Sequence, residues 1–420
     1  MTAPMETHLE HLAILAPNWV GDLVMATPVL EAACARGDQG TGEPFGRISI
    51  LVRAHLAPLL RGGPAEAHFV ELAGREREGE ALRGLEPDAV LLLSNSFGSA
   101  WRAWRAGVPR RAGNALRGRR WLLTHSVRPP TRDGRRLPVP TAHVLRDVAG
   151  LFGIHVPDVH PRLYVTPEEE RAGADLLAAA GLGVGEAYVV CTPGAAFGAA
   201  KLWPPERFAR ALDELYARHG WRGVLTGGPA EDPLVEHVAA LCEHPVISLA
   251  GAPRELGSLK PLIRDARLLL VGDSGPRWVA AAFDVPCVSI MGPNVPELTA
   301  TSLELCAVVR RDLECSPCAQ RTCPLGHHRC MTEISADEVV AAAEESSAGT
   351  SRERARHDAE RAATRRPDPG PRALLAGGPR AGRAGAAGSA RAHRRALGRR
   401  SPPPRPAARR DPPRRAARRQ

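Results

Sequence analysis

A chain of 420 residues is long enough for two α/β domains with substantial cores. Its net charge of +10 comes from the C-terminal end, because residues 351–420 hold 21 arginines against 5 acidic residues, which leaves 35 basic and 41 acidic residues in positions 1–350. The first 11 residues lack the basic start and apolar core of a secretory signal, and no apolar stretch approaches the roughly 20 residues that cross a bilayer, so the sequence predicts a cytoplasmic protein without a transmembrane segment.

The first half of the chain alternates apolar strands with helical stretches. Leu12–Ala16, Ile48–Val52 and Ala89–Leu93 are predicted to be buried strands, and Leu23–Ala33 has the apolar periodicity of a helix. Residues Pro17–Asp22 form the turn between the first strand and that helix. Alternation with uninterrupted apolar runs is typical of a parallel sheet covered on both faces.

The second half repeats this pattern after a Pro- and His-rich segment, His155–Leu163, which is predicted to link two domains. A helix is predicted from about Pro205 and another over Ser335–Glu345. The predicted domains are residues 1–160 and 161–348, followed by a tail at 349–420. The predicted strands of this half are Ala187–Thr192, Gly223–Thr226, Val246–Leu249, Leu268–Val271 and Pro286–Met291.

Three junctions between a strand and a helix carry residues that suit phosphate binding: Pro17–Asp22, Pro193–Pro204 and Gly272–Pro276. A helix start offers free backbone N–H groups and a positive dipole end, and a glycine there lets a ligand approach the main chain. Ser274 or Asp273 is expected to cap the helix after the third junction. Taken alone, the third junction fits an ordinary capped turn equally well.

Eight short motifs occur in a family order: Asn18-Trp-Val-Gly-Asp22, Asn95-Ser-Phe97, Gly107-Val-Pro-Arg-Arg111, Leu122-Leu-Thr124, Pro193-Gly-Ala-x-Phe-Gly-x-Ala-Lys201, Gly227-Gly-Pro229, Asp273-Ser-Gly-Pro276 and Gly292-Pro293. Together they resemble the ADP-heptose:lipopolysaccharide heptosyltransferases, most of all the heptosyltransferase II branch, over roughly residues 10–345. The dinucleotide-binding motif G-x-G-x-x-G and the P-loop motif are absent, which disfavours a dehydrogenase or a P-loop enzyme.

The resemblance implies a GT-B fold, in which two Rossmann-like domains face a central cleft. It also implies an inverting, metal-independent glycosyltransferase without a cofactor. The reaction would transfer L-glycero-D-manno-heptose from ADP-heptose to the inner-core heptose of lipopolysaccharide. The predicted partners are therefore the ADP-heptose donor and a lipopolysaccharide inner-core acceptor at the inner-membrane surface, with no specific nucleic acid.

Two residues are predicted to be catalytic. The resemblance implies that Asp22 is the base for the acceptor hydroxyl, although an acidic residue in a first helical turn can simply complement the helix dipole. Lys201, one of very few lysines, suits the diphosphate that leaves, and a solvated surface lysine is the alternative. The amides of Ser274 and Gly275 are predicted to hold the same diphosphate.

The other predicted donor-binding residues are Thr192, Gly194, Gly227, Glu231 and Asp273. Glu231 resembles the acidic residue of the family that meets the ADP ribose, because a carboxylate can accept bonds from both hydroxyls of a cis-diol. An ordinary acidic residue at a helix start explains Glu231 equally well. Asp273 is anionic, so we expect it to cap the turn or bind sugar hydroxyls rather than phosphate.

Two further features bear on the substrates. Trp278 stands where the family usually has His; this indole N–H can donate one hydrogen bond but carries no charge, so a changed sugar preference or an inactive homologue remains open. Residues Trp101–Arg136 hold eleven arginines and one aspartate. Arg110, Arg111 and Arg120 are predicted to bind the anionic acceptor, with a solvated basic loop as the alternative.

Four cysteines lie close together in the sequence, Cys315, Cys318, Cys323 and Cys330, with His327 and His328 between the last two. This spacing could hold a structural zinc ion, or the thiols could be free or redox-active. No metal is predicted at the catalytic site, because the implied transfer needs none.

The tail, residues 349–420, is rich in Arg, Ala, Pro and Gly and is predicted to be disordered. It could be a dispensable extension, or its charge could attract anionic lipid or nucleic acid. The alternatives to heptosyltransferase II are heptosyltransferase I or III, an inactive homologue, or a nucleic-acid-binding protein that uses the cysteines and the tail. A peripheral location at the inner face of the cytoplasmic membrane is also predicted.

Overall fold

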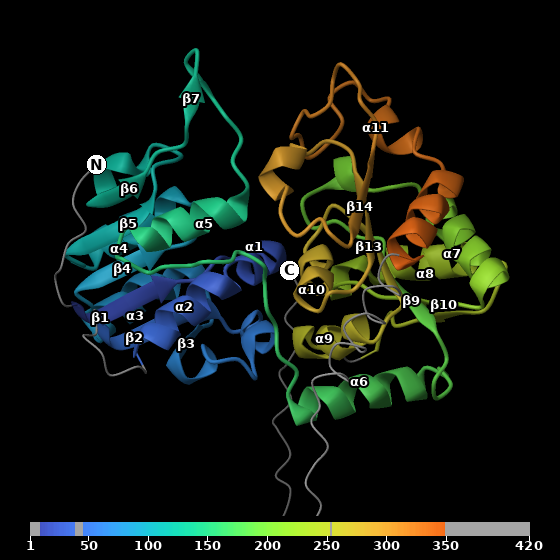
Figure 1. Ribbon diagram of the computed structural model, residues 1–420, viewed down its shortest axis with the longest axis horizontal. Helices are drawn as coiled ribbons and strands as arrows, with labels where there is room; N and C mark the ends of the chain where they lie inside the picture. Colours follow the sequence, from blue (N-terminus) through green and yellow to red (C-terminus); the bar gives the residue numbers. More distant parts are fainter. Residues whose placement is uncertain (1–8, 38–44, 253, 349–420) are drawn as a thin grey trace, which may run out of the picture. The chain divides into compact units, whose positions relative to one another are not determined.

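The computed structural model describes residues 9–37, 45–252 and 254–348. Its framework is two six-stranded sheets, ordered β3-β2-β1-β4-β5-β6 and β11-β10-β9-β12-β13-β14 (Figure 1). All neighbouring strands in both sheets are parallel, and the strand order is that of doubly wound dinucleotide-binding folds. The two predicted Rossmann-like sheets are thus confirmed, while the predicted disordered tail, residues 349–420, lies outside the described residues.

The N-terminal sheet is built from strands that the chain reaches through short helices. Its strands are β1 (Leu9–Leu15), β2 (Phe45–Arg53), β3 (Phe69–Leu72), β4 (Ala89–Leu92), β5 (Arg110–Asn114) and β6 (His125–Val127). Its helices are α1 (Val20–Met25), α2 (Thr27–Gly37), α3 (Glu78–Leu85), α4 (Phe97–Arg105) and α5 (Thr141–Gly150), with single 3-10 turns at η1 (Ala57–Leu60) and η4 (Arg119–Leu122). A small hairpin, β7 (Thr131–Arg132) and β8 (Arg135–Arg136), extends from this half.

The C-terminal half has the same plan with longer helices. Its strands are β9 (Tyr188–Thr192), β10 (Arg222–Leu225), β11 (Val246–Ser248), β12 (Leu268–Gly272), β13 (Cys287–Met291) and β14 (Cys306–Arg310). Its helices are α6 (Pro167–Ala179), α7 (Pro205–His219), α8 (Asp232–Leu241), α9 (Leu256–Arg264), α10 (Pro276–Ala282), α11 (Arg329–Thr332) and a last helix at residues 336–348, with 3-10 turns at η5 (Ala199–Lys201) and η6 (Pro229–Glu231). The helices predicted from Pro205 and over 335–345 are both present.

Both faces of each sheet are buried, as the uninterrupted apolar runs predict. Along β1, Leu12 and Ile14 belong to one core cluster, and Leu15 on the opposite face belongs to another. Along β9, Val190 joins the same cluster as Leu12, whereas Val189 packs on the far face under α7. One apolar core therefore contains residues from both halves of the chain.

Several local predictions need correction. The helix predicted over Leu23–Ala33 is two helices, because Pro28 has no N–H to offer the carbonyl of Val24; the Thr27 hydroxyl donates to that carbonyl instead (2.9 Å). Strands β3, β5, β6 and β14 were not predicted. The sequence of β5, Arg-Arg-Ala-Gly-Asn, shows why: it has no apolar run.

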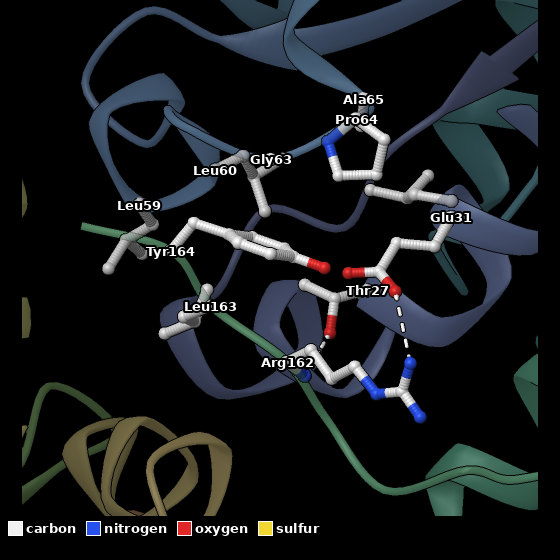
Figure 2. A pocket seen from close by; sticks show the side chains of 11 residues that line it. Thr27, Glu31, Leu59, Leu60, Gly63, Pro64, Ala65, Arg162, Leu163 and Tyr164 are labelled. Atoms are coloured by element: carbon white, nitrogen blue, oxygen red, sulfur yellow. Dashed lines mark hydrogen bonds and ion pairs between the residues drawn. The ribbon is translucent and has the colours of Figure 1, made fainter. Parts of the chain in front are cut away.

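The segment predicted to link the halves has no regular structure and crosses α2 (Figure 2). The backbone N–H of Arg162 donates to the Thr27 hydroxyl (2.9 Å), and the Arg162 guanidinium pairs with the Glu31 carboxylate (3.9 Å). Burial raises the pKa of Glu31, and the Tyr164 hydroxyl and the Arg162 charge partly offset that rise. The cavity beside these residues holds only about 10 Å³, so it has room for a water molecule and none for a ligand.

Candidate donor and catalytic site

A cavity of about 630 Å³ opens at the carboxyl ends of β9, β10 and β12. This size is typical of sites for small molecules and cofactors. Most of the wall comes from the C-terminal half, and Trp19, Val20 and Gly21 contribute from the N-terminal half. Six of the predicted donor-binding residues line it: Thr192, Gly194, Gly227, Glu231, Ser274 and Gly275. The side of the cavity towards α6 and α9 is mainly apolar and is formed by Leu176, Leu256, Leu259 and Leu262 together with Ser258.

The Glu231 carboxylate has a fixed place on this wall. Its Oε2 accepts the backbone N–H of Gly228 (2.8 Å). A Cβ atom on Gly194 would lie 2.1 Å from Oε1 of Glu231, and one on Gly227 would lie 2.9 Å from Oε2. Glycine is therefore required at both positions for the carboxylate to lie where it does.

Thr192 ends β9 at the bottom of the cavity. Its side chain is buried, and its hydroxyl oxygen has no hydrogen-bond partner among the described residues. A buried polar atom without a partner costs free energy. The Thr192 hydroxyl is thus available to a ligand in the cavity.

The junction between β12 and α10 differs from the expectation. Helix α10 begins after Gly275, and no side chain caps it, so the predicted cap by Ser274 or Asp273 is wrong. Asp273 is engaged elsewhere: its carboxylate accepts from the Lys201 ammonium (2.7 Å) and from the Asn294 amide. An acidic side chain held by a buried ammonium is not free to turn back towards the helix amides.

Lys201 is buried, so the alternative of a solvated surface lysine is excluded. Besides the Asp273 carboxylate, its ammonium donates to the Asp273 carbonyl (3.0 Å), and it lies 4.8 Å from the centre of the Phe197 ring. Neither Lys201 nor Asp273 lines this cavity. The ion pair lies beside the cavity, next to the Ser274–Gly275 turn that lines it.

Asp22 lies in the first turn of α1, directly after the cavity-lining Val20 and Gly21. Among the described residues no hydrogen bond or ion pair holds its carboxyl group. Burial raises its pKa to about 6, and the nearby charge of Lys201 lowers it by a smaller amount. Two carboxyl groups next to one lysine thus have different surroundings: Asp273 is hydrogen-bonded to the ammonium, whereas Asp22 has no hydrogen-bond partner among the described residues and has a pKa near 6.

Helices α1 and α10 bring these groups together through close backbone packing. A Cβ on Gly275 would lie 2.7 Å from Cβ of Val20, and one on Gly21 would lie 2.8 Å from Cδ1 of Trp278. Trp278, which the motif resemblance places where a His is expected, is buried and covers the turn that carries Asp22. The indole therefore contributes to packing between the two halves.

The three predicted acceptor arginines differ in their surroundings. Arg111 donates to the carbonyls of Leu122 (2.7 Å), Val108 and Pro109 (3.1 Å), so its guanidinium stabilises its own loop. Arg110 is partly buried and Arg120 is exposed. The neighbouring Arg119 was not singled out by sequence, yet it is fully buried and donates to carbonyls at Asn114, Ser94 and Ser96.

The cysteines Cys315, Cys318, Cys323 and Cys330 line one small cavity of about 20 Å³. Nevertheless, within the described ranges no group of three or more His, Cys, Asp or Glu is placed to hold a metal ion. Zinc binding by this cluster stays a prediction.

The family model of glycosyltransferase family 9 (heptosyltransferase) matches residues 75–329. The chain belongs to this family. It is 26% identical over 347 residues to lipopolysaccharide heptosyltransferase 2 of Escherichia coli strain K12, covering 78% of this chain and 96% of that protein. It is 40% identical over 116 residues to lipopolysaccharide heptosyltransferase 3 of the same strain, covering 26% of this chain and 32% of that protein.

The fold agrees with a solved structure of the family. The E. coli ADP-heptose lps heptosyltransferase II matches with a TM-score of 0.64 at 23% identity, covering 81% of this chain and 99% of that one. A GT-B architecture and glycosyltransferase activity are therefore established for this chain at the level of the family. In the part of the chain that the structure describes, no helix is long and apolar enough to cross a membrane.

Proposed function

We propose that this family 9 member is a heptosyltransferase II, which transfers heptose from ADP-heptose to the inner-core heptose of lipopolysaccharide. The names of the relatives that match most of the chain support this substrate pair. The observation that carries the proposal is the pair of carboxyl groups around Lys201: Asp22 without a partner and with a pKa near 6, and Asp273 hydrogen-bonded to the ammonium.

The cavity provides the donor site. Its apolar wall suits an adenine ring, and Glu231, fixed by the Gly228 amide, faces the space where a ribose diol can donate to it. The Thr192 hydroxyl offers one further hydrogen bond. The Ser274–Gly275 turn and Lys201 lie at the edge nearest Asp22, which is where the diphosphate and the anomeric carbon belong.

The reaction is an inverting displacement. Asp22 takes the proton from the acceptor hydroxyl as its oxygen attacks the anomeric carbon from the side opposite the phosphate. The bond from that carbon to the phosphate oxygen breaks, and ADP leaves with the charge that Lys201 and the amides of Ser274 and Gly275 stabilise. Asp273 holds the ammonium in place. Because these groups supply the positive charge, the transfer needs no metal, and we expect kcat to survive EDTA.

We assign the anionic acceptor to the arginine-rich stretch of the N-terminal half. Arg110 and Arg120 are the better candidates, because the guanidinium of Arg111 already donates to three carbonyls. The acceptor is carried by a membrane-anchored lipid, so we place the enzyme in the cytoplasm at the inner face of the cytoplasmic membrane.

Transfer assays with three acceptors test the proposal. The full-length enzyme is given ADP-heptose and a core that carries no heptose, one heptose or two heptoses, with ADP-glucose as the control donor. Transfer only to the one-heptose core supports heptosyltransferase II. Transfer to the two-heptose core would favour heptosyltransferase III. The 40% identity to a heptosyltransferase 3 over 116 residues supports this alternative. Transfer to none, with no binding of ADP-heptose by calorimetry, would indicate an inactive homologue.

The pH dependence tests Asp22 as the base. Since its pKa is raised to about 6, the carboxylate form is lost as pH falls through 6. We expect kcat/KM to be level above pH 7 and to fall about tenfold for each pH unit well below 6. A profile that stays level down to pH 5 would assign the proton transfer to another group.

A further inference from the structure

Four aromatic side chains form one cluster on the surface of the N-terminal half. Phe97, Trp101 and Trp104 lie on α4, and Trp121 lies on η4. The ring centres of Trp101 and Trp104 are 5.0 Å apart, and Trp121 lies 6.1 Å from Phe97 and 6.4 Å from Trp101. Phe97, Trp104 and Trp121 are 41%, 45% and 62% exposed. Aromatic residues make up only 4% of the chain, so this concentration in solvent is unusual.

Hydrogen bonds at the ends of α4 and η4 hold the aromatic cluster in its exposed position. Ser96 caps α4 by accepting the Ser99 N–H (3.0 Å), and the buried Arg119 ties η4 to the carbonyls that precede α4. On the inner side of α4, Arg102 donates to the buried Glu78 (2.6 and 2.8 Å). Ordered and exposed aromatic rings of this size favour a contact surface over an unpacked edge of the core.

The same support connects the cluster to the catalytic turn. Glu78 also pairs with Arg53, and Arg53 donates to the Asn18 side chain (2.8 Å), four positions before Asp22. The aromatic surface and the proposed base therefore belong to one hydrogen-bonded unit. None of the four aromatic residues lines the donor cavity, so they form a surface separate from it.

The chain segment that carries the cluster is positively charged. From Ala89 to Arg132 the chain contains no acidic residue. Arg105 and Arg117, which have no part in the proposed acceptor site, are exposed, and no described carboxylate pairs with them. In the first turn of α3, which packs against α4, Glu78 pairs with Arg102 and Arg53, and Glu80 pairs with Arg77. Indole rings favour the boundary between water and lipid, and each arginine near an anionic bilayer contributes to binding.

We propose that Phe97, Trp101, Trp104 and Trp121 form a docking surface for an anionic phospholipid bilayer. The exposed rings enter the headgroup region and the surrounding arginines contact lipid phosphates. The inference deepens the proposed function, on which it rests for its choice of partner: an acceptor anchored in a bilayer is delivered to a site whose base is linked to the docking surface. Charge complementarity and the exposed indoles together favour a lipid surface over a protein partner.

Fluorescence quenching by brominated lipids tests the proposal in the full-length enzyme. The vesicles are phosphatidylglycerol in phosphatidylcholine with brominated acyl chains. The arginine-rich C-terminal residues 351–420 contain no tryptophan, so binding through their charge cannot produce quenching. We expect strong quenching of the enzyme, little quenching of the double variant Trp104→Ala/Trp121→Ala, and an affinity for vesicles lower by about tenfold in that variant at high salt.

A matched control removes other exposed apolar side chains. Val184 and Leu241 are 109% and 37% exposed and lie in the C-terminal half, so Val184→Ser/Leu241→Ser should be quenched like the unmodified enzyme. Equal quenching of the Trp104→Ala/Trp121→Ala variant, or vesicle binding without any quenching, would overturn the proposal. So would a dimer in sedimentation that the Trp variant converts to monomer, because the surface would then bind a second copy.

A water-soluble, deacylated acceptor separates the two proposals. Transfer to it needs no bilayer, so Trp104→Ala/Trp121→Ala should retain full turnover with this acceptor and lose rate only with acceptor in vesicles. If the unmodified enzyme does not transfer heptose to the soluble acceptor, the proposed function is contradicted. The quenching experiment still tests the docking surface in that case.

Discussion

The two halves of this protein share a strand order and differ in what their turns carry. In both sheets the first strand of the half lies between the second and the fourth, so both place their first strand-to-helix turn at the same point. After β1 that turn leads to Asp22, an acidic residue without a partner among the described residues. After β9 it leads through a long glycine- and alanine-rich loop to Lys201, whose ammonium donates two hydrogen bonds to Asp273.

The comparison shows that topology determines where chemistry takes place and local sequence determines which chemistry it is. A doubly wound sheet always leaves a crevice at the carboxyl ends of its central strands. The C-terminal half fills that position with small residues and a paired lysine, which suits a bound diphosphate. The N-terminal half places there one carboxyl group whose pKa is raised by burial, which suits proton transfer.

The largest expected effect comes from removing the unpaired carboxyl group. Asp22→Asn should lower turnover by about 10²- to 10⁴-fold, because the amide cannot accept the proton. Its melting temperature should stay the same or rise, since a neutral amide avoids the cost of a buried carboxylate. Assays of transfer and thermal unfolding measure both.

The matched control for Asp22 is Glu206, which is exposed in the first turn of α7. Glu206→Gln should retain full turnover. If Asp22→Asn also retained it, Asp22 would only complement a helix dipole, and the contrast between the two halves would disappear.

The second effect concerns the paired carboxylate. Asp273→Asn leaves the buried Lys201 ammonium without its charge partner and should cost about 3–5 kcal/mol in the free energy of unfolding. Lys201→Met should mainly weaken binding of ADP-heptose, and the double variant should be less destabilised than the sum of the single ones. Urea unfolding and calorimetry measure these quantities. Additive losses in the double variant would mean that the pair does not act as a unit.

Much of the fold was predictable because strands of a parallel sheet that is buried on both faces consist of uninterrupted apolar residues. The predicted Ala89–Leu93 and Ala187–Thr192 differ from β4 and β9 by a residue at one end. The edge strands β3 and β6 and the arginine-rich β5 were missed, since a short or edge strand needs no such run. The break between α1 and α2 was predictable from Pro28, because a proline lacks the backbone N–H that would continue the helix.

The glycine-rich turns around the donor cavity were also predictable from their motifs, but the partners within the site were not. Lys201 and Asp273 are 72 positions apart, and nothing near either of them in the sequence indicates the pairing. The same holds for Trp278: the sequence marks it as a departure from the motif pattern but does not predict that it covers Gly21. Contacts of this kind form only when segments far apart in the sequence come together in the fold.

The third prediction tests the packing that brings the two halves together. Gly275 has a helical φ of −55°, so an alanine there is not strained by its backbone, and its cost comes from the contacts of the new Cβ with Val20 (2.7 Å) and with the backbone nitrogen of Gly21 (3.2 Å). Gly275→Ala should destabilise the protein by about 1–3 kcal/mol and lower donor affinity. The control Gly84→Ala, in α3 with nothing within 4 Å, should leave stability unchanged or raise it by up to about 1 kcal/mol. Equal effects of the two variants would show that the contact yields without cost.

The smallest expected effect concerns two buried hydroxyl groups, one of which lines the donor cavity and one of which does not. The Thr192 and Ser289 hydroxyls are both buried without a partner among the described residues, but only Thr192 lines the donor cavity. Neither Thr192→Val nor Ser289→Ala removes a hydrogen bond from the protein alone, so neither should lower its melting temperature. We expect Thr192→Val to weaken ADP-heptose binding by about 2- to 12-fold, the equivalent of one neutral hydrogen bond, and Ser289→Ala to leave it unchanged. Unchanged affinity in Thr192→Val would place the donor elsewhere in the cavity and leave Glu231 and the Ser274–Gly275 turn to hold it.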